Sequence, residues 1–249
     1  MSTDLDIVLA SLNTHGGRSA EGQPYDLAAT CSQLRADVIL LQEVWRPHGE
    51  PDPVAEIAAA LGAQARHATL CSDTDLRSLG ISTETTRGRW GLATLTRAPV
   101  TRCEVADLGR TPGDPIPRVA QLITLEIAGG GVIRVANTHL THLLASPVQL
   151  IRLVRHLALA DVPTVIAGDL NMPVPLTWLA AGYAPAVLGR TYPAHQPLVQ
   201  LDHVLTDRRV ARRGGDVLAA AGSDHRPIRA RLRLARCGPA ARTKAGPAS

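Results

Sequence analysis

Short polar motifs stand at the ends of apolar, strand-like runs, and this placement constrains the fold more than any other feature of the chain. The motifs are Asn13-Thr14-His15, Gln42-Glu43, Asn137-Thr138-His139, Gly168-Asp169-Leu170-Asn171, Asp202-His203 and Ser223-Asp224-His225. Acids, amides and imidazoles are costly to bury in such surroundings unless they converge on a partner. A divalent metal ion and a phosphate group are the partners that suit this mixture of side chains.

The bulk of the chain suits a folded domain. Its 249 residues are 45% hydrophobic, enough for a sizeable core, and we expect one domain over residues 1–236 and a disordered tail over residues 237–249. No apolar run reaches about 18 residues, so we expect no membrane span. The acidic start is unlike a secretory signal, and the four cysteines are scattered without a CxxC pair. A reduced, cytoplasmic protein, monomeric in solution, is the expectation.

The positive charge is almost entirely arginine. The net charge is +4, and Lys244 is the only lysine. Guanidinium groups suit phosphate oxygens, so the excess favours a polyanionic substrate such as DNA or RNA. A GC-rich coding sequence gives the same composition without any such function. Phe is absent and aromatics are 2% of the chain, which argues against a broad stacking platform for single-stranded nucleic acid.

Apolar strand-like runs alternate with a few helices along the chain. Helices are expected over residues 25–35, 53–61 and 147–159, with Ser146 as the N-cap of the third. Glycines 129–131 predict a hairpin between strands at 118–127 and 132–138. Polar residues 72–89 suggest a surface loop bordering the site. Hairpins with few helices favour two packed sheets with helices on their outer faces.

Three of the motifs supply acids and amides. Glu43 ends a buried run and is a natural ligand for a hard metal ion, although a strand-end acid can also simply face water. The amide of Asn13 suits binding the metal or fixing Glu43, or else it opens a turn. Asp169 and Asn171 are two residues apart, so an extended segment turns both to one side, where they can orient and deprotonate a water. The alternative is a polar turn, and Gly168 permits either a tight turn or a close approach of substrate.

The histidines complete the candidate chemistry. His139 ends a strand and can donate to a phosphoryl oxygen. His142 would point to the opposite face if that strand continued, which argues against a two-histidine metal site. A carboxylate such as Asp202 can hold the imidazole of His225 in one tautomer, and Asp224 can face a metal. For an isolated Asp-His pair, a surface turn is the simpler explanation.

Taken together and in this order, the motifs resemble the endonuclease/exonuclease/phosphatase superfamily, whose members have the DNase I-like fold. The matching runs extend from residue 5 to about residue 234. The resemblance implies an α/β fold: a four-layer α/β-sandwich of two packed, mostly antiparallel sheets flanked by helices. It also implies a phosphoesterase that depends on Mg²⁺ or Mn²⁺.

The resemblance also implies roles for the candidate residues. Glu43 would be the principal metal ligand, with Asn13 and Asp224 close to the same ion. Asp169 and Asn171 would position or activate the attacking water and bind the phosphate. His225 would serve as base or transition-state stabiliser, oriented by Asp202. His139 would bind the phosphate or protonate the leaving group, and Arg118 would lie near the site.

One position departs from the family pattern. His15 stands where many members carry an acid or Asn, and it would favour Mn²⁺, donate to the phosphate, or do neither. The segment after Asn171 is short and offers no evident DNA-reading insertion, which argues against abasic-site repair.

The leading hypothesis is a phosphodiesterase or endonuclease acting on nucleic acid. A phosphoesterase for a small phosphoester or lipid head group is the alternative, and only Trp45, Trp90 and Trp178 could mark an exposed apolar loop for lipid. A non-catalytic binding module on the same fold is a third class, which the complete set of acids and His225 disfavours.

Overall fold

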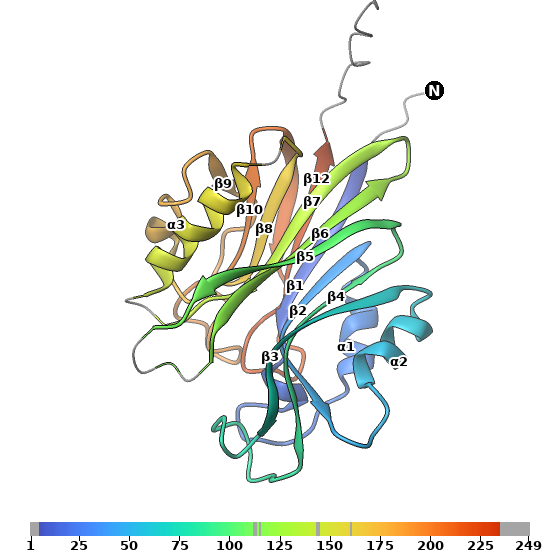
Figure 1. Cartoon of the computed structure of the whole chain (residues 1–249), viewed down its shortest axis with the longest axis vertical. Coiled ribbons are helices and arrows are strands. Elements are labelled where there is room, and N and C mark those ends of the chain that lie inside the picture. The colour runs from blue at the N-terminus through green and yellow to red at the C-terminus, as the bar shows by residue number, and fades with distance from the viewer. Residues whose placement is uncertain (1–4, 112–113, 115, 143–144, 160, 235–249) are drawn as a thin grey trace, which may run out of the picture.

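Two six-stranded sheets form the body of the protein (Figure 1). The computed structural model describes residues 5–111, 114, 116–142, 145–159 and 161–234. The first sheet has the strand order β11-β12-β1-β2-β4-β3, and the second has β5-β6-β7-β8-β10-β9. Each sheet contains one parallel pair, β1–β2 and β7–β8, among antiparallel neighbours. The expected pair of packed, mostly antiparallel sheets is confirmed.

The elements follow the apolar runs of the sequence. The first sheet contains β1 (Asp6–Asn13), β2 (Val38–Pro47), β3 (Gln64–Asp75), β4 (Arg87–Thr96), β11 (Val210–Val217) and β12 (Ile228–Leu234). The second contains β5 (Val100–Gly109), β6 (Arg118–Ile127), β7 (Gly131–His139), β8 (Thr164–Asp169), β9 (Tyr183–Pro185) and β10 (Asp202–Asp207). The helices are α1 (Leu27–Gln33), α2 (Pro53–Ala60), α3 (Ser146–Leu157) and α4 (Val174–Thr177), with a 3-10 turn, η1, at His15–Gly17.

Three apolar clusters separate four layers. One lies between the sheets and includes Leu9 of β1 and Ile123 of β6. A second packs α3 on the second sheet, and a third packs α1 and α2 on the first. Successive residues of β1 alternate between two of these clusters, because side chains of a strand point to opposite faces: Leu9 lies between the sheets and Ala10 under the helices. This is the four-layer α/β-sandwich that the sequence predicted.

Two helices begin at acidic caps, whereas the third begins differently from the prediction. Asp26 accepts a hydrogen bond from Ala29 N (2.8 Å) before α1, and Asp52 accepts one from Val54 N (3.0 Å) before α2. Ser146 is the first residue of α3 rather than its N-cap, and the residue before it makes no side-chain capping bond. The Ser146 hydroxyl instead donates to the carbonyl of Asn171 (3.5 Å), which ties α3 to a candidate-site segment.

Topology brings the polar motifs to one edge of the sandwich. The parallel pairs β1–β2 and β7–β8 each have an intervening helix, so their carboxyl ends lie at the same edge of each sheet. Strand β10 is antiparallel to β8, and its first residue, Asp202, pairs with Asp169 at the end of β8. Strand β12 likewise starts beside the end of β1, with Ile228 opposite Ser11. Motifs after β1, β7 and β8 and before β10 and β12 therefore meet.

The predicted surface loop at 72–89 is wrong in its extent. Strand β3 continues to Asp75 and β4 begins at Arg87, which leaves residues 76–86 as the loop. Its apolar residues Leu76 and Ile81 are buried.

Several other expectations concern parts of the chain beyond the core. The predicted tail at 237–249 and its Cys237 lie outside the described residues. Cys31, Cys71 and Cys103 are free thiols. Within the described part of the chain, no helix combines the length and the apolar character needed to cross a bilayer. The cytoplasmic compartment and the monomeric state stay predictions.

Candidate active site

A cavity of about 390 Å³ opens at the edge where the motifs meet. It is lined by candidate residues from most of the polar motifs, by Arg118, and by an apolar group from the loops around them. The polar lining residues are His15, Glu43, Arg118, His139, His142, Asp169, Asn171, Asp224 and His225. Asn13 and Asp202 lie just behind this surface, buried and bonded to residues that line it.

Glu43 reaches the cavity from a bulge in β2. The pairing of β2 with β4 shifts register between Leu41 and Val44, and Glu43 has a left-handed backbone with φ of 55°. Its carboxylate accepts a hydrogen bond from Asn13 Nδ2 (3.0 Å), and the same nitrogen donates to Asp169 Oδ2 (3.1 Å). Asn13 Oδ1 accepts from the backbone N–H of His15 (3.0 Å). Asn13 therefore bridges the two carboxylates through its NH₂ group, which matches one of the functions considered for it, fixing Glu43. Its role as a metal ligand stays a prediction.

Left-handed backbone is concentrated at this edge. Apart from glycines, only four of the residues described have positive φ, and three of them line the cavity: His15, Glu43 and Asn171. The fourth, Arg35, follows α1. Such conformations are strained for residues with a Cβ and persist only where the surroundings enforce them. Their clustering marks this cavity as the functional edge.

The Gly168-to-Asn171 motif works differently from the prediction. A Cβ on Gly168 (φ +140°) would lie 1.9 Å from the carbonyl oxygen of Thr138, so glycine here allows close approach of β7 rather than of substrate. Asn171 is not on an extended segment, since its φ is 50°. The chain turns after Asp169, whose Oδ1 accepts from Asn171 N (2.9 Å). Both side chains nevertheless line the cavity.

Asp202 and His225 form the predicted pair. Both are buried, and His225 Nδ1 donates to Asp202 Oδ2 at 2.8 Å. This bond leaves His225 Nε2 facing the cavity, 3.7 Å from Asp169 Oδ2. The Tyr192 ring lies against the imidazole with a centroid separation of 4.8 Å. His225 is buried, so the surface turn that was the alternative for the Asp224-His225 dipeptide is excluded for this histidine.

His139 and His142 meet on Asn171. Strand β7 ends at His139, and the chain turns there, so His142 also lines the cavity. Asn171 Nδ2 lies 3.0 Å from His139 Nε2 and donates to Leu140 O (2.9 Å), while Asn171 Oδ1 lies 3.1 Å from His142 Nδ1. This network assigns the proton of His139 to Nδ1, which lies 3.7 Å from Glu43 Oε1, and the proton of His142 to Nδ1.

The remaining candidates stand at opposite sides of the cavity. His15 Nδ1 is buried without a hydrogen-bond partner and lies 3.6 Å from Asp224 Oδ1. Ser223 fixes this segment, because its hydroxyl donates to Asn13 O (2.7 Å). Across the cavity, Arg118 is buried, and its Nε donates to Asp114 Oδ2 (2.8 Å). All the residues predicted for the site are thus gathered around one cavity.

A buried amide pair supports the Glu43 bulge from the other sheet. Gln42 Nε2 donates to Asn137 Oδ1 (2.8 Å), and Asn137 Nδ2 donates to the carbonyls of Leu41 (3.2 Å) and Ala93 (2.9 Å). These carbonyls belong to a residue pair of β2 and β4 that stands directly before the bulge. Asn137 therefore holds the strand distortion that turns Glu43 toward the cavity.

Burial and charge shift the titration of the central groups. Burial raises the pKa of Glu43, the Asn13 hydrogen bond lowers it, and the nearby Asp224 carboxylate raises it further. Burial likewise raises the pKa of Asp169 to about 7, against the opposing effect of His225. Burial disfavours the His225 cation, but Asp202 and Asp169 outweigh burial and raise the pKa of His225 well above its usual value. Burial, with Arg118, holds the pKa of His139 well below its usual range.

One compact group of metal-ligand side chains lies in the described residues. The ligand atoms of Asp169, Asp202 and His225 all lie within 4.8 Å of one another. The sequence had placed the metal instead at Glu43, Asn13 and Asp224. Two of these three residues are already bonded to each other, because Asp202 Oδ2 accepts a hydrogen bond from His225 at 2.8 Å. The compact group is therefore explained in large part by this hydrogen-bonded pair. Asp202 Oδ1 has no hydrogen-bond partner.

Sequence reasoning missed several residues of the cavity. His142 was set aside because the strand was extended past His139, although the spacing of the two histidines was visible. Tyr192 and the apolar lining residues gave no motif. The apolar ones are Leu79, Ile81, Trp90, Ile116 and Leu201. They come from segments that only the tertiary fold brings together.

Solved structures with the same fold support the architecture. An endonuclease/exonuclease/phosphatase from Beutenbergia cavernae superposes with a TM-score of 0.73 at 23% identity, covering 92% of this chain and 72% of that one. The human Nocturnin catalytic domain with a bound sulfate anion gives 0.71 at 17% identity, covering 94% and 97%. A Bacteroides thetaiotaomicron mannosyl-6-phosphatase gives 0.67 at 15% identity, covering 91% and 99%.

Sequence comparison gives the family itself. A search of curated proteins finds no match. The sequence model of the Endonuclease/Exonuclease/phosphatase family matches residues 10–225, a span from β1 to His225 that contains the polar motifs of the cavity. The superfamily consists of phosphoesterases and generally depends on divalent metal ions. The chain belongs to the endonuclease/exonuclease/phosphatase family.

Proposed function

We propose that this protein hydrolyses a phosphoester bond with the help of a divalent metal ion. The observation that carries the proposal is the arrangement around Asp169 Oδ2. Asn13 Nδ2 lies 3.1 Å from this oxygen, His139 Nε2 3.6 Å and His225 Nε2 3.7 Å. An acid with a raised pKa thus faces an imidazole held in its charged form, which is the pairing that general acid–base catalysis uses.

The carboxylates of the cavity fit a divalent cation. Glu43, Asp169 and Asp224 line one cavity, and burial raises the pKa of the first two, so a cation there would relieve unfavourable negative charge. Carboxylate oxygens suit Mg²⁺ or Mn²⁺. We assign Glu43 and Asp224 as the residues that hold the ion, with Asn13 beside it. When bound, the ion neutralises charge that develops on the phosphoryl oxygens.

Asp169 takes the proton of the attacking water. Its Oδ1 is held by Asn171 N and its Oδ2 by Asn13, so the carboxylate is fixed before substrate binds. A pKa of about 7 makes it an effective base near neutral pH. His225, held by Asp202, presents a charged Nε2–H to the transferring phosphoryl group and stabilises its developing negative charge.

Phosphate oxygens are bound by donors on the other side of the cavity. Arg118 supplies a permanent charge, and His142 supplies an exposed imidazole held by Asn171. Asn171 uses both amide hydrogens on His139 and Leu140, so it positions the histidines rather than the phosphate. The sulfate anion bound to the Nocturnin catalytic domain supports a tetrahedral-anion site on this fold.

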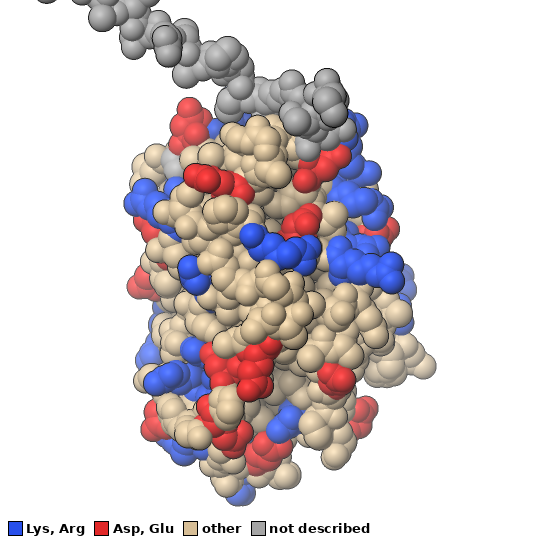
Figure 2. All heavy atoms as spheres, turned by 90° about the vertical axis from the view of Figure 1, so that its right-hand side faces the viewer, with Lys and Arg blue, Asp and Glu red and all other residues tan. Residues whose placement is uncertain are grey.

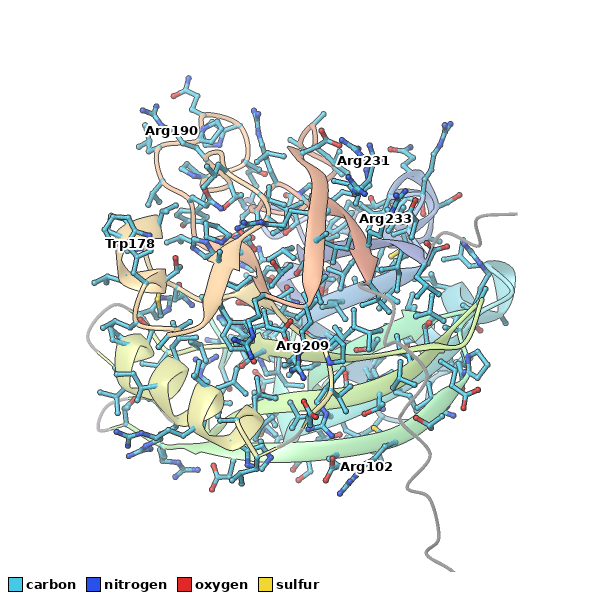
Figure 3. All side chains as sticks on the ribbon, turned by 90° about the horizontal axis from the view of Figure 1, so that it is seen from above. Arg102, Trp178, Arg190, Arg209, Arg231 and Arg233 are labelled. Atoms are coloured by element: carbon cyan, nitrogen blue, oxygen red, sulfur yellow. The ribbon has the colours of Figure 1, made fainter. Side chains whose placement is uncertain are left out.

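The choice of substrate follows from the distribution of charge. In the part of the chain that the structure describes, eleven arginines make ion pairs with acidic side chains. Basic and acidic groups are interspersed on the face shown in Figure 2. Of the arginines labelled in Figure 3, Arg231 and Arg233 lie on β12 of the first sheet, whereas Arg102 lies on β5 of the second. Positive charge that is already paired contributes less to binding a polyanion. This favours a small phosphoester over nucleic acid, which remains the competing proposal.

Turnover with defined metals tests the proposal. Bis-p-nitrophenyl phosphate, p-nitrophenyl phosphate and supercoiled plasmid are assayed with Mg²⁺, with Mn²⁺ and with EDTA. We expect hydrolysis of a small ester that requires metal and falls about a hundred- to ten-thousand-fold in His225→Ala. Activity that survives EDTA, or that is unchanged in His225→Ala, contradicts it. Metal-dependent plasmid nicking with no turnover of the small esters favours the nuclease.

A further inference from the structure

We propose that the cavity takes a small phosphoester whose organic group is compact and apolar, and that Leu79, Ile81 and Ile116 select it. The inference rests on the proposed function and names the substrate class for the same cavity. The lining has two unlike halves: acids, imidazoles and Arg118 form the polar half, and Leu79, Ile81, Trp90 and Ile116, which pack in one apolar cluster, form the other. A phosphate bound by the first half directs the rest of the ester toward the second.

The apolar half is built into the fold, because the loop at 76–86 is closed by its own backbone bonds. Ile81 N donates to Leu76 O (2.9 Å), and Arg77 N donates to Glu84 O (3.0 Å). The guanidinium of Arg18, just beyond η1, donates hydrogen bonds of 2.6, 2.8 and 2.9 Å to the Glu84 carboxylate. The loop is therefore held against the segment that carries His15, and the apolar surface is formed before a ligand arrives.

Gly16 shows how closely the two halves meet. It has φ of +63° and sits under the loop, where a Cβ would lie 2.9 Å from Leu76, 3.4 Å from Trp90 and 3.6 Å from Ile81. The residue before it, His15, lines the polar half. The apolar wall thus begins immediately beside His15, whose Nδ1 lies 3.6 Å from the candidate metal ligand Asp224, within the reach of a single small molecule.

Ile116 packs in the same apolar cluster as Ile81 and Trp90, and its backbone is tied to the residue that holds the phosphate-binding cation. Asp114 Oδ1 accepts from Ile116 N (3.0 Å), and Asp114 Oδ2 accepts from Arg118 Nε (2.8 Å) and from the Thr141 hydroxyl. One carboxylate therefore fixes both the guanidinium and the apolar side chain. This arrangement fixes the distance between Arg118, which would bind the charged end of a ligand, and Ile116, which would contact its apolar part.

The two halves impose a chemical selection on the organic group. A sugar or polyol would bring hydroxyl groups against side chains that offer no hydrogen bond. A benzyl or branched alkyl group would instead leave water for an apolar surface, which is favourable. The cavity of about 390 Å³ is near the lower end of small-molecule sites, roughly 300–1,000 Å³, which suits a compact organic group.

Two esters whose alcohols are of comparable size but opposite polarity test the selection. The ratio of kcat/KM for benzyl phosphate to that for glycerol phosphate is measured with Mn²⁺ and with Mg²⁺. We expect a ratio of about ten or more in the wild type, and a fall of about tenfold in Leu79→Ser and in Ile116→Thr, as one lost apolar contact produces. Leu159→Ser, at an 87% exposed leucine after α3, is the matched control and should keep the ratio.

Binding of stable analogues separates this inference from the proposed function. Calorimetry compares benzylphosphonate with 2-hydroxyethylphosphonate in the presence of Mn²⁺. Tighter binding of benzylphosphonate that is lost in Leu79→Ser supports the apolar subsite even if neither ester is hydrolysed, which would count against the proposed function alone. Equal hydrolysis of both esters with equal phosphonate binding overturns the subsite and leaves the phosphoesterase standing. Plasmid nicking with a higher kcat/KM than benzyl phosphate hydrolysis also overturns it.

Discussion

The two ends of the sandwich differ in which residues adopt left-handed backbone conformations and in whether charged groups are buried or exposed. At the cavity, three residues with side chains adopt left-handed backbone, and carboxylates are buried beside one another. At the far end, the β6–β7 hairpin turns on Gly129 (φ 92°) and Gly130 (φ 86°), which adopt such conformations freely. Charges there are exposed and paired, as in Asp6 with Arg233.

The difference indicates where stability has been exchanged for function. A fold gains nothing from strain or from buried like charges, so their concentration at one edge points to a requirement of the site. Substitutions that neutralise the cavity should therefore abolish activity without weakening the fold. Substitutions at the far end should affect neither.

Glu43→Gln should give the largest effect, a loss of activity without a loss of stability. We expect activity to fall about a thousand- to ten-thousand-fold, since the principal metal ligand is lost. We also expect the metal-free protein to become more stable at neutral pH. The pKa of Glu43 is raised in the folded state, so folding is disfavoured once the unfolded chain ionises this group, and the penalty grows as the pH rises toward the folded value.

The measurement is thermal denaturation in EDTA between pH 4 and pH 8, beside metal-dependent turnover. Glu56→Gln, at an exposed glutamate of α2, is the control. A Glu43→Gln variant that is inactive and also less stable at neutral pH would break the comparison.

Asp169→Asn should lower activity by about a hundred- to ten-thousand-fold, because a base in the transition state is removed. In the wild type, the pKa of Asp169 near 7 predicts that kcat/KM falls about tenfold per pH unit below that value, as the carboxylate becomes protonated. The pH profile of the wild type is measured between 5 and 9. A residual activity in Asp169→Asn with the same acid limb would assign the titration to another group.

Asp202→Asn should shift the alkaline limb of the pH–activity profile to lower pH. Asp202 raises the pKa of His225, so its neutralisation lets the imidazolium lose its proton at lower pH. Activity should then decline from a lower pH than in the wild type, with a loss of about ten- to a hundred-fold at pH 8. A uniform loss with the alkaline limb in place would make Asp202 a structural residue only.

Local patterns allowed much of the fold to be predicted from the sequence. The bounds of β6 and β12 agree with the apolar runs, and the glycines at 129–131 marked the hairpin. The end of β3 was missed because β3 is the edge strand of its sheet, and its exposed residues Ser72 and Asp73 carry no apolar signal. Ser146 was misplaced as a cap because its hydroxyl bonds to a distant segment, which no local rule reveals.

The acids and imidazoles of the site were predicted because strand ends at one edge must meet. The supports that Asn13 gives to Glu43 and Asp202 gives to His225 were also expected. Two others were not, because they depend on contacts between distant segments. The Asn137 amide reaches across from the second sheet to hold the Glu43 bulge, and the loop at 76–86 is placed by Arg18. Neither contact is signalled by a residue spacing or a motif in the sequence.

Asn137→Ala tests the support beneath the strained edge. It leaves the carbonyls of Leu41 and Ala93 without a partner in the interior, and we expect a loss of about 2–3 kcal/mol in the free energy of unfolding. Activity should fall as well, because the bulge that turns Glu43 is released. Urea denaturation and turnover are measured together. An unchanged unfolding midpoint would show that the bulge does not depend on Asn137.

Asp6→Asn makes the smallest change and tests the far end. Its carboxylate is exposed and paired with Arg233 at 2.5 and 2.7 Å, and exposed pairs contribute little because water and salt screen them. We expect the melting temperature to stay within about 2 °C of the wild type and activity to be unaffected at low and high salt. The pairing with Arg233 lowers the pKa of Asp6, so any small effect should vanish as the pH falls and the carboxylate is protonated. A loss as large as that of Asn137→Ala would mean that the far end also depends on particular charges. The concentration of demanding interactions at the cavity would then say nothing about function.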